Sequence, residues 1–144
     1  MKNSNAHKTA RGRKCPSKPM KNLEKYDLLK GKILDFGCGR GFDADFYNTD
    51  RYDPYYAPTK PKGKYDTITC NYVLNVVTAE EAKSVIETIL KHLKKNGTAY
   101  LSVRRDIKIE GYTSKGTYQR NVKLKLPVLR ENGSYCTYIL TKGE

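Results

Sequence analysis

The chain of 144 residues has no tryptophan, two methionines and two histidines, and its four cysteines are widely separated. No two of them form a CxxC pair, so the spacing argues against a structural zinc site and against a disulfide framework. No apolar run approaches the roughly 18 residues that a membrane helix needs, and no apolar signal-peptide core lies near the N-terminus. We therefore expect a cytoplasmic protein with no metal site and no membrane partner.

Acidic residues are scarce relative to basic ones. Lys and Arg total 28 against 15 Asp and Glu, which gives a formal net charge of +13 and a pI near 9.6. A chain this basic is attracted to polyanions through counterion release. Excess lysine also serves simple solubility. The charge favours a nucleic-acid partner over that plainer explanation.

The length fits one domain, and a basic segment precedes it. Residues 1–22 carry seven Lys or Arg, no acid and two prolines, without helical or strand periodicity. We interpret them as an extended N-terminal arm, either a disordered tail or an arm laid on substrate or over a cofactor. Residues 23–144 then form the folded domain.

Strand patterns alternate with helix patterns along that domain and end in a hairpin. The expected helices are a short one from Leu23 to a Gly31 C-cap, one at 42–47 and one from Thr78, with a capping box to Glu81, to about Lys95. The expected strands are 32–37, 49–52, 65–77, 98–104 and two around the turn at 131–133. This order predicts an α/β fold with a mostly parallel sheet and an antiparallel C-terminal hairpin.

A glycine-rich turn, Asp35-x-Gly37-x-Gly39-x-Gly41, follows the first apolar strand. It is a poor match to the dinucleotide fingerprint GxGxxG, and it lacks the GK[ST] of a P-loop. The spacing resembles motif I of class I S-adenosylmethionine (SAM)-dependent methyltransferases, which have a Rossmann-like sheet. The resemblance implies that Asp35 and these glycines bind SAM, facing its amino-acid and sugar parts.

The stretch "DPYY", from Asp53, is spelled like the catalytic tetrapeptide of enzymes that methylate DNA base amines. Asp53 lies only twelve residues after Gly41, however, so it ends the second strand rather than the fourth. A carboxylate there accepts hydrogen bonds from ribose hydroxyls, and we interpret Asp53 as a cofactor ligand. Tyr55 and Tyr56 would either stack on an adenine or a substrate base or cover the sheet face.

Eleven residues separate Asp53 from Tyr65, too few for a crossover helix and another strand. We therefore expect the family's third strand to be missing, with a proline-rich loop over the sheet edge.

The catalytic candidates follow the next buried strand. Asn71 is placed to hold a substrate amine and to contact the cofactor, or else makes a plain strand-end hydrogen bond. Tyr72 would wall the pocket, and Asn75 lies on the following turn, where it would act in catalysis or as a cap. Cys70 lacks the Pro-Cys loop of thiolate-dependent methyltransferases, so it is interpreted as a core residue.

A narrower resemblance covers residues 7–120 as islands of motif. "HKTARGRKCPSKPM", "DFGCGRGFD", "YDP", "NYVLNVV" and "TSKGTYQR" are similar, in order, to motifs of the DNA phosphorothioation-associated methyltransferase family, whose members are longer. After Arg120 the chain departs from that family, so we expect no counterpart of any extra substrate-binding region. The expected nucleic-acid contacts are Arg11, Arg13, Lys14, Lys115, Gln119 and Arg120, with "TSKGTYQR" serving either base contact or a structural turn.

Together these features predict a minimal SAM-dependent methyltransferase that modifies nucleic acid, with DNA favoured over RNA and a base amine as acceptor. The alternatives are a small-molecule or RNA methyltransferase and a non-catalytic SAM- or nucleic-acid-binding module. So small a domain would have loose sequence specificity or share recognition within a homodimer.

Overall fold

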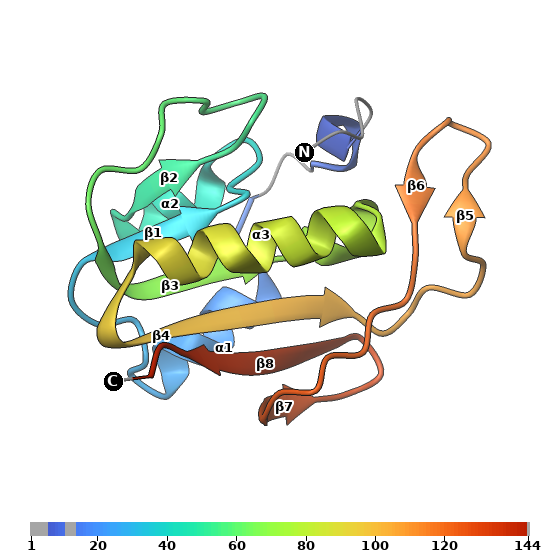
Figure 1. The fold of residues 1–144 in the computed structure, drawn as a ribbon. Coiled ribbons are helices and arrows are strands. Elements are labelled where there is room, and N and C mark those ends of the chain that lie inside the picture. Colours follow the sequence, from blue (N-terminus) through green and yellow to red (C-terminus); the bar gives the residue numbers. More distant parts are fainter. Residues whose placement is uncertain (1–5, 11–13, 144) are drawn as a thin grey trace.

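A computed structural model describes residues 6–10 and 14–143. Its main sheet has six strands in the order β2-β1-β3-β4-β8-β7 (Figure 1). These are β1 (Ile33–Phe36), β2 (Asp50–Tyr52), β3 (Tyr65–Asn71), β4 (Leu93–Arg104), β7 (Val128–Glu131) and β8 (Tyr135–Thr141). The strands from β2 to β4 are parallel, and β8 and β7 add an antiparallel edge. The predicted fold class is confirmed.

The edge at β2 lacks a further strand. Between β2 and β3 the chain makes a tight turn, in which Asp53 and Ala57 exchange backbone hydrogen bonds of 2.9 and 3.0 Å, and then a loop. No strand is found at 58–64, all of which the structure describes. The expectation of a missing third strand is confirmed, and the reason is the shortness of this connection.

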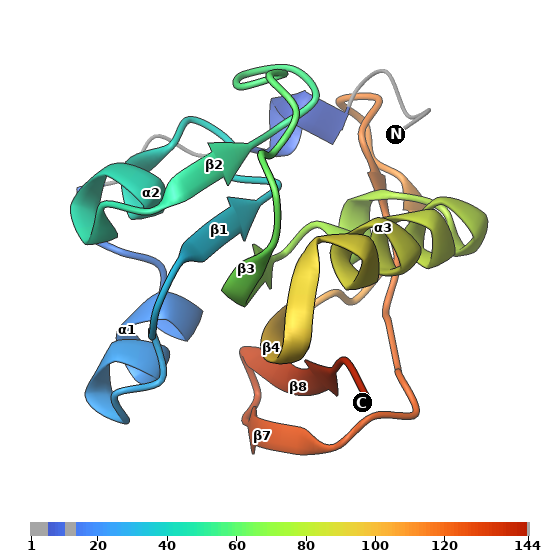
Figure 2. The same ribbon diagram turned by 60° about the vertical axis from the view of Figure 1, so that its left-hand side comes forward.

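Helices cover the sheet on both faces (Figure 2). One face carries α3 (Ala79–His92), whose apolar side packs into the main core with Leu34, Ile68 and Leu101. The other carries α1 (Lys18–Lys25) and α2 (Phe42–Tyr47). No helix in the described residues is long and apolar enough to cross a membrane.

The third helix follows its sequence signals closely. Thr78 Oγ1 accepts from the Glu81 N–H and the Glu81 carboxylate accepts from the Thr78 N–H, both at 3.1 Å, so the predicted capping box is formed. The helix ends at His92, about three residues earlier than expected, because β4 begins at Leu93.

The first helix is displaced from its predicted position. It spans Lys18–Lys25, so the expectation of extended chain to residue 22 is wrong for residues 18–22. Pro19 lies in the first turn, where its missing N–H costs nothing. Met20 and Leu23 are fully buried against Tyr100. This contact with the sheet overrides the coil-like local composition.

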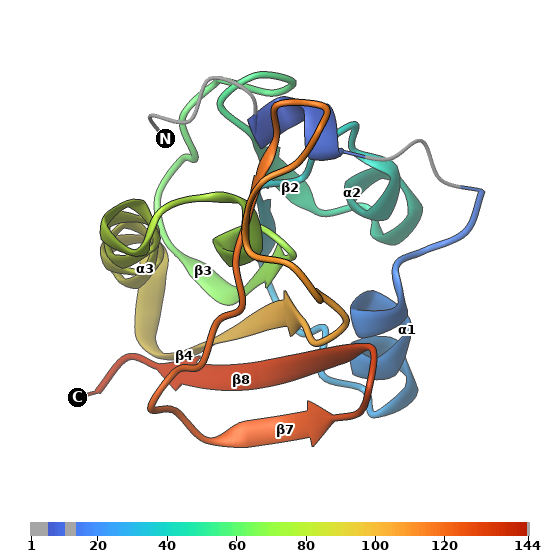
Figure 3. The same ribbon diagram turned by 90° about the vertical axis from the view of Figure 1, so that its right-hand side faces the viewer.

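Two hairpins complete the fold. The expected one joins β7 to β8 around 132–134, where Asn132 Oδ1 accepts from the backbone N–H groups of Ser134 and Tyr135 at 2.8 and 3.0 Å. A smaller ribbon of β5 (Gly111–Tyr112) and β6 (Tyr118–Gln119) projects beyond the carboxyl end of β4 (Figure 1), so it runs in front of the sheet when this end faces the viewer (Figure 3). The segment "TSKGTYQR" forms this ribbon's turn and second strand.

Candidate functional site

A cavity of about 510 Å³ lies where the parallel strands β1, β2 and β3 end. Carboxyl ends of parallel strands are the usual place for a ligand in an α/β sheet. The N-terminal residues 6–10, the glycine turn with the start of α2, the turn after β2 and the segment after β3 line the cavity. Lys18 at the start of α1, Arg104 at the end of β4, Asp106 and Ser134 complete the lining. Its volume is that of a typical small-molecule site.

The glycine turn brings backbone to the cavity wall. Gly37 has φ +77°, and a Cβ on it would lie 2.2 Å from Val73 Cγ2 across the cavity floor. Gly37 and Gly39 line the cavity. Gly41, with φ +87°, instead begins α2 and lies outside the lining, where a side chain would meet the Arg51 guanidinium. Of the three glycines predicted as cofactor ligands, two therefore face the cavity and the third shapes the turn.

Asp53 lies at the end of β2, as predicted, and its carboxylate organises two turns. Its Oδ2 accepts from the Gly39 N–H at 2.9 Å, and its Oδ1 accepts from the N–H groups of Tyr55 and Tyr56 at 2.9 and 3.0 Å. With two lone pairs on each oxygen, these described partners leave one acceptor position on Oδ2. Asp53 can thus take a single further hydroxyl while backbone groups hold it in place.

Asp35 is a buried carboxyl group on the same wall, 3% exposed. Thr69 Oγ1 donates to its Oδ1 at 3.1 Å. Burial, and secondarily the neighbouring Asp43 carboxylate, raise the pKa of Asp35 to about 7. The site therefore contains a carboxyl group that a cationic ligand would favour in its ionised form.

Asn71 closes the cavity from the end of β3. Its side-chain Oδ1 and Nδ2 are both buried, and neither has a hydrogen-bond partner among the described residues. A buried amide without partners is destabilising and uncommon in folded proteins. Such a group next to a cavity is available to pair with a ligand.

Tyr72, the next residue, lines the cavity with φ +65°. A bulky residue in the left-handed region is strained, and such strain concentrates at functional sites. Its backbone N–H donates to the Ser102 carbonyl at 2.8 Å, which fixes the segment between β3 and η2 (Leu74–Val76). Tyr72 is thus placed to wall the pocket, as the sequence predicted.

Asn75 has a structural role instead. Its Oδ1 accepts from the Arg104 N–H at 2.7 Å, and its Nδ2 donates to the Arg120 carbonyl at 3.0 Å. It is fully buried and outside the cavity lining, so the catalytic interpretation of Asn75 gains no support. Cys70 is fully buried in the core as predicted, and burial raises the pKa of its thiol.

The structure describes four of the six predicted nucleic-acid contacts. Lys14 and Lys115 are exposed, whereas the Gln119 amide donates to the Ile109 carbonyl and Arg120 Nε to the Val77 carbonyl. The first of these two bonds closes the base of the β5–β6 ribbon, and the second attaches the ribbon to the segment that precedes α3. Arg11 and Arg13 lie outside the described residues.

Several residues on the cavity wall were not identified from the sequence, and three of them matter most here. His7 and Ala10 come from the N-terminal segment, and Arg40 comes from within the glycine turn. The sequence signal that could have found His7 and Ala10 is the motif that begins "HKTA", one of the motifs on which the narrower family resemblance rests. Nothing local indicated that it would pack against residues 53–57.

The profile of a protein family described as "Methyltransferase domain" matches residues 7–139. This match includes every residue of the cavity lining except Ala6, and it covers nearly the whole chain. The chain belongs to the class I SAM-dependent methyltransferases. No curated protein matches its sequence.

Solved methyltransferase structures share the fold at low sequence identity. The Burkholderia thailandensis 1,6-didemethyltoxoflavin-N1-methyltransferase has a TM-score of 0.63 and 13% identity, with 88% of this chain and 78% of that chain covered. The N-methyltransferase NodS from Bradyrhizobium japonicum has a TM-score of 0.55 and 11% identity, with 88% and 86% covered. A protein solved in work on the conversion of a disulfide bond into a thioacetal group during echinomycin biosynthesis has a TM-score of 0.52 and 14% identity. That match covers 72% of the present chain and 56% of the other protein.

Proposed function

We propose that this methyltransferase binds SAM in the 510 Å³ cavity and transfers its methyl group to an amine nitrogen of a nucleic-acid base, with DNA favoured over RNA. The observation that carries the proposal is the unpaired Asn71 amide, which is buried beside the cavity opposite the glycine turn. An amide offers both an acceptor and a donor, so its oxygen can hold an amine N–H.

The cavity residues fit the cofactor. The open acceptor position on Asp53 Oδ2 suits one ribose hydroxyl, and Gly37 and Gly39 let backbone approach the ligand without an intervening Cβ. Asp43 places negative charge on the wall, and Asp35 adds to it when a cationic ligand favours its ionised form, which suits a ligand that carries a sulfonium and an ammonium group. The solved B. thailandensis and NodS enzymes were obtained with S-adenosylhomocysteine (SAH) bound.

The residues of this chain contribute orientation and exclusion of water. SAM supplies a methyl group on sulfur, and its transfer forms an N–C bond, breaks the S–C bond, leaves SAH and releases the amine proton to solvent. Asn71 holds the amine in line, and Tyr72 limits access of water to the cavity. Alignment of this kind is the main contribution that a methyl transfer requires of a protein.

Charge supports a polyanionic substrate. The net charge of +13 is large for 144 residues, and the cavity wall itself includes Lys18, Arg40 and Arg104. Cationic groups near the site can contact backbone phosphates while a base is unstacked into the cavity. The islands of motif shared with the DNA phosphorothioation-associated family support DNA in particular.

A small-molecule amine is the second candidate substrate. It is favoured by the solved neighbours, since one is a 1,6-didemethyltoxoflavin-N1-methyltransferase and the other is an N-methyltransferase. Both candidates use the same cofactor cavity and the same Asn71 contact, and they differ only in what occupies the outer part of the site.

The test begins with calorimetric titration of SAM and SAH. We expect wild-type protein to bind SAM and Asp53→Ala to bind it at least tenfold more weakly, because a hydrogen bond to a charged group and the order of two turns are lost. Thr88→Ala, on the exposed side of α3, is the matched control and should bind as wild type does.

Radiolabelled SAM is then incubated with duplex DNA, single-stranded DNA, RNA and a panel of small amines. Label in DNA supports the proposal. Label found only in small amines would show that the substrate is a small-molecule amine. SAM binding without any labelled product would indicate a non-catalytic module. If wild-type protein binds no SAM, or if Asp53→Ala binds it normally, the cofactor assignment fails.

A further inference from the structure

The N-terminal segment lies against the cofactor cavity. Ala6 and His7, in the short helix η1 (Ala6–Thr9), and the following Ala10 line its wall. The segment sits beside the loop that follows β2, far from it in sequence (Figures 1 and 2). It is thus part of the same enclosure as Asp53.

Aromatic contacts fix the segment on that loop. The His7 ring stacks on Tyr55, with ring centroids 3.9 Å apart and planes inclined by 11°. The Tyr56 ring meets His7 edge-on at 6.5 Å, and its hydroxyl donates to the His7 carbonyl at 3.4 Å. Stacked aromatic pairs are worth about 0.5–1.5 kcal/mol, so these contacts are strong enough to hold the segment and weak enough to open.

Close approach on the other side completes the enclosure. A Cβ built on Gly39 would lie 3.2 Å from the Ala10 Cβ, so the segment comes directly up to the glycine turn. Farther along the chain Ser17 is anchored, since its N–H and Oγ donate to the two oxygens of Asp43 at 2.9 and 2.7 Å. The segment therefore bridges the turn after β2 and the turn after β1.

We propose that His7 is a residue of the cofactor site, and that the His7–Tyr55 stack closes over the nucleoside end of bound SAM. This inference rests on the proposed binding of SAM in the cavity. Asp53 is the proposed ribose ligand, and Tyr55, two residues later, lines the same cavity together with His7, so the stacked pair would contact the nucleoside of a bound cofactor. Cofactor exchange then requires the segment to separate from Tyr55.

Dissociation kinetics test the proposal. Bound labelled SAM is chased with unlabelled SAM, and we expect release from His7→Ala to be about tenfold faster than from wild type, the scale of one lost stacking contact. His7→Phe keeps a flat ring and should restore slow release. Lys8→Ala, an exposed position on the same segment, is the matched control and should leave the release rate unchanged.

The possible results distinguish failure of the proposed role of His7 from failure of the proposed binding of SAM. Absence of SAM binding by wild type overturns the proposed function itself. Normal SAM binding by wild type together with unchanged release from His7→Ala overturns only the role of His7. A purely structural role would lower the thermal stability of ligand-free His7→Ala without changing release, which also counts against the proposal.

The absence of tryptophan provides a second measurement. Tyr55→Trp introduces a single indole that keeps a stacking surface for His7. We expect saturating SAM to change its emission, and this change to be lost when His7→Ala is added. An emission unaffected by SAM that calorimetry shows to be bound would contradict the closure.

Discussion

At the scale of single residues, Asp35 links the site to stability. Burial raises the pKa of its carboxyl from 3.8 to about 7, so the folded protein holds a proton that the unfolded chain releases above pH 4. The stabilisation is complete below about pH 4 and is lost as the pH rises towards 7. Asp35→Asn, which cannot ionise, should escape this loss.

Urea unfolding at pH 4.5, 6 and 7.5 measures the effect. The free energy of unfolding of Asp35→Asn minus that of wild type should rise with pH by at most about 4 kcal/mol, the equivalent of some three pKa units. Asp66→Asn is a control of opposite sign, because the Lys32 N–H and then Lys94 lower the pKa of Asp66. A pH-independent difference at Asp35 would contradict the prediction.

Asn71 and Asn75 provide a second test at this scale, since one amide has no described partner and the other has two. Asn71→Leu removes an unpaired buried group, so the free energy of unfolding should rise by about 1 kcal/mol while methyl transfer is lost. Asn75→Leu strands the Arg104 N–H and the Arg120 carbonyl, so it should destabilise by about 2–4 kcal/mol. Chemical denaturation of both variants decides the matter, and destabilisation by both would mean that Asn71 is a structural residue.

At the scale of elements, local signals determined most of what could be predicted. The capping box of α3, the turn at 132–134 and the short span between Asp53 and Tyr65 all act within a few residues, so sequence reasoning located them. The position of Asp53 in the site followed from the same counting. A residue count sufficed because it limits which elements the chain can form.

The elements that sequence reasoning misplaced depend on contacts between distant segments. Helix α1 is set by Met20 and Leu23 against Tyr100 and by the bonds of Ser17 to Asp43. The docking of η1 depends on Tyr55, about 48 residues along the chain. Neither partner is visible in the composition of the N-terminal segment, whose prolines and lysines indicated coil. The same non-local packing decides that Asn75 holds the fold together while Asn71 faces the cavity.

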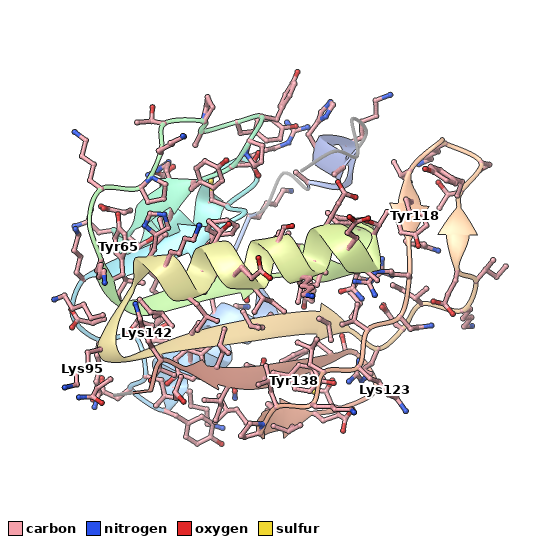
Figure 4. All side chains as sticks on the ribbon, viewed as in Figure 1. Tyr65, Lys95, Tyr118, Lys123, Tyr138 and Lys142 are labelled. Carbon is pink, nitrogen blue, oxygen red and sulfur yellow. The ribbon has the colours of Figure 1, made fainter. Side chains whose placement is uncertain are left out.

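At the scale of the whole molecule, a nucleic-acid substrate requires a surface on which basic side chains contact its phosphates. Figure 4 places Tyr118 and Lys123 at one end of the molecule and Lys95 and Lys142 at the other. The first end carries the β5–β6 ribbon, on which Tyr112 is 75% exposed and packs 5.4 Å from the Tyr118 ring. An exposed Tyr112 that packs on a half-buried Tyr118, with Lys115 and Lys123 exposed on the same part of the chain, suits stacking with an unpaired base and contact with phosphates.

The double variant Lys115→Gln/Lys123→Gln tests whether DNA binds at this end of the molecule or responds only to the total charge of the protein. The logarithm of the DNA association constant should fall linearly with the logarithm of salt concentration, and this double variant should reduce the slope by about 1–2 units, one for each lost phosphate contact. Lys91→Gln/Lys95→Gln removes the same charge from exposed positions in the last turn of α3 and at the start of β4, where Figure 4 shows Lys95 at the other end, and should leave the slope nearly unchanged. Fluorescence anisotropy with a short labelled DNA measures both. Equal effects of the two variants would mean that DNA association depends on the net charge alone and not on the ribbon surface. If wild-type protein binds SAM but no DNA, a small-molecule amine remains as the candidate substrate.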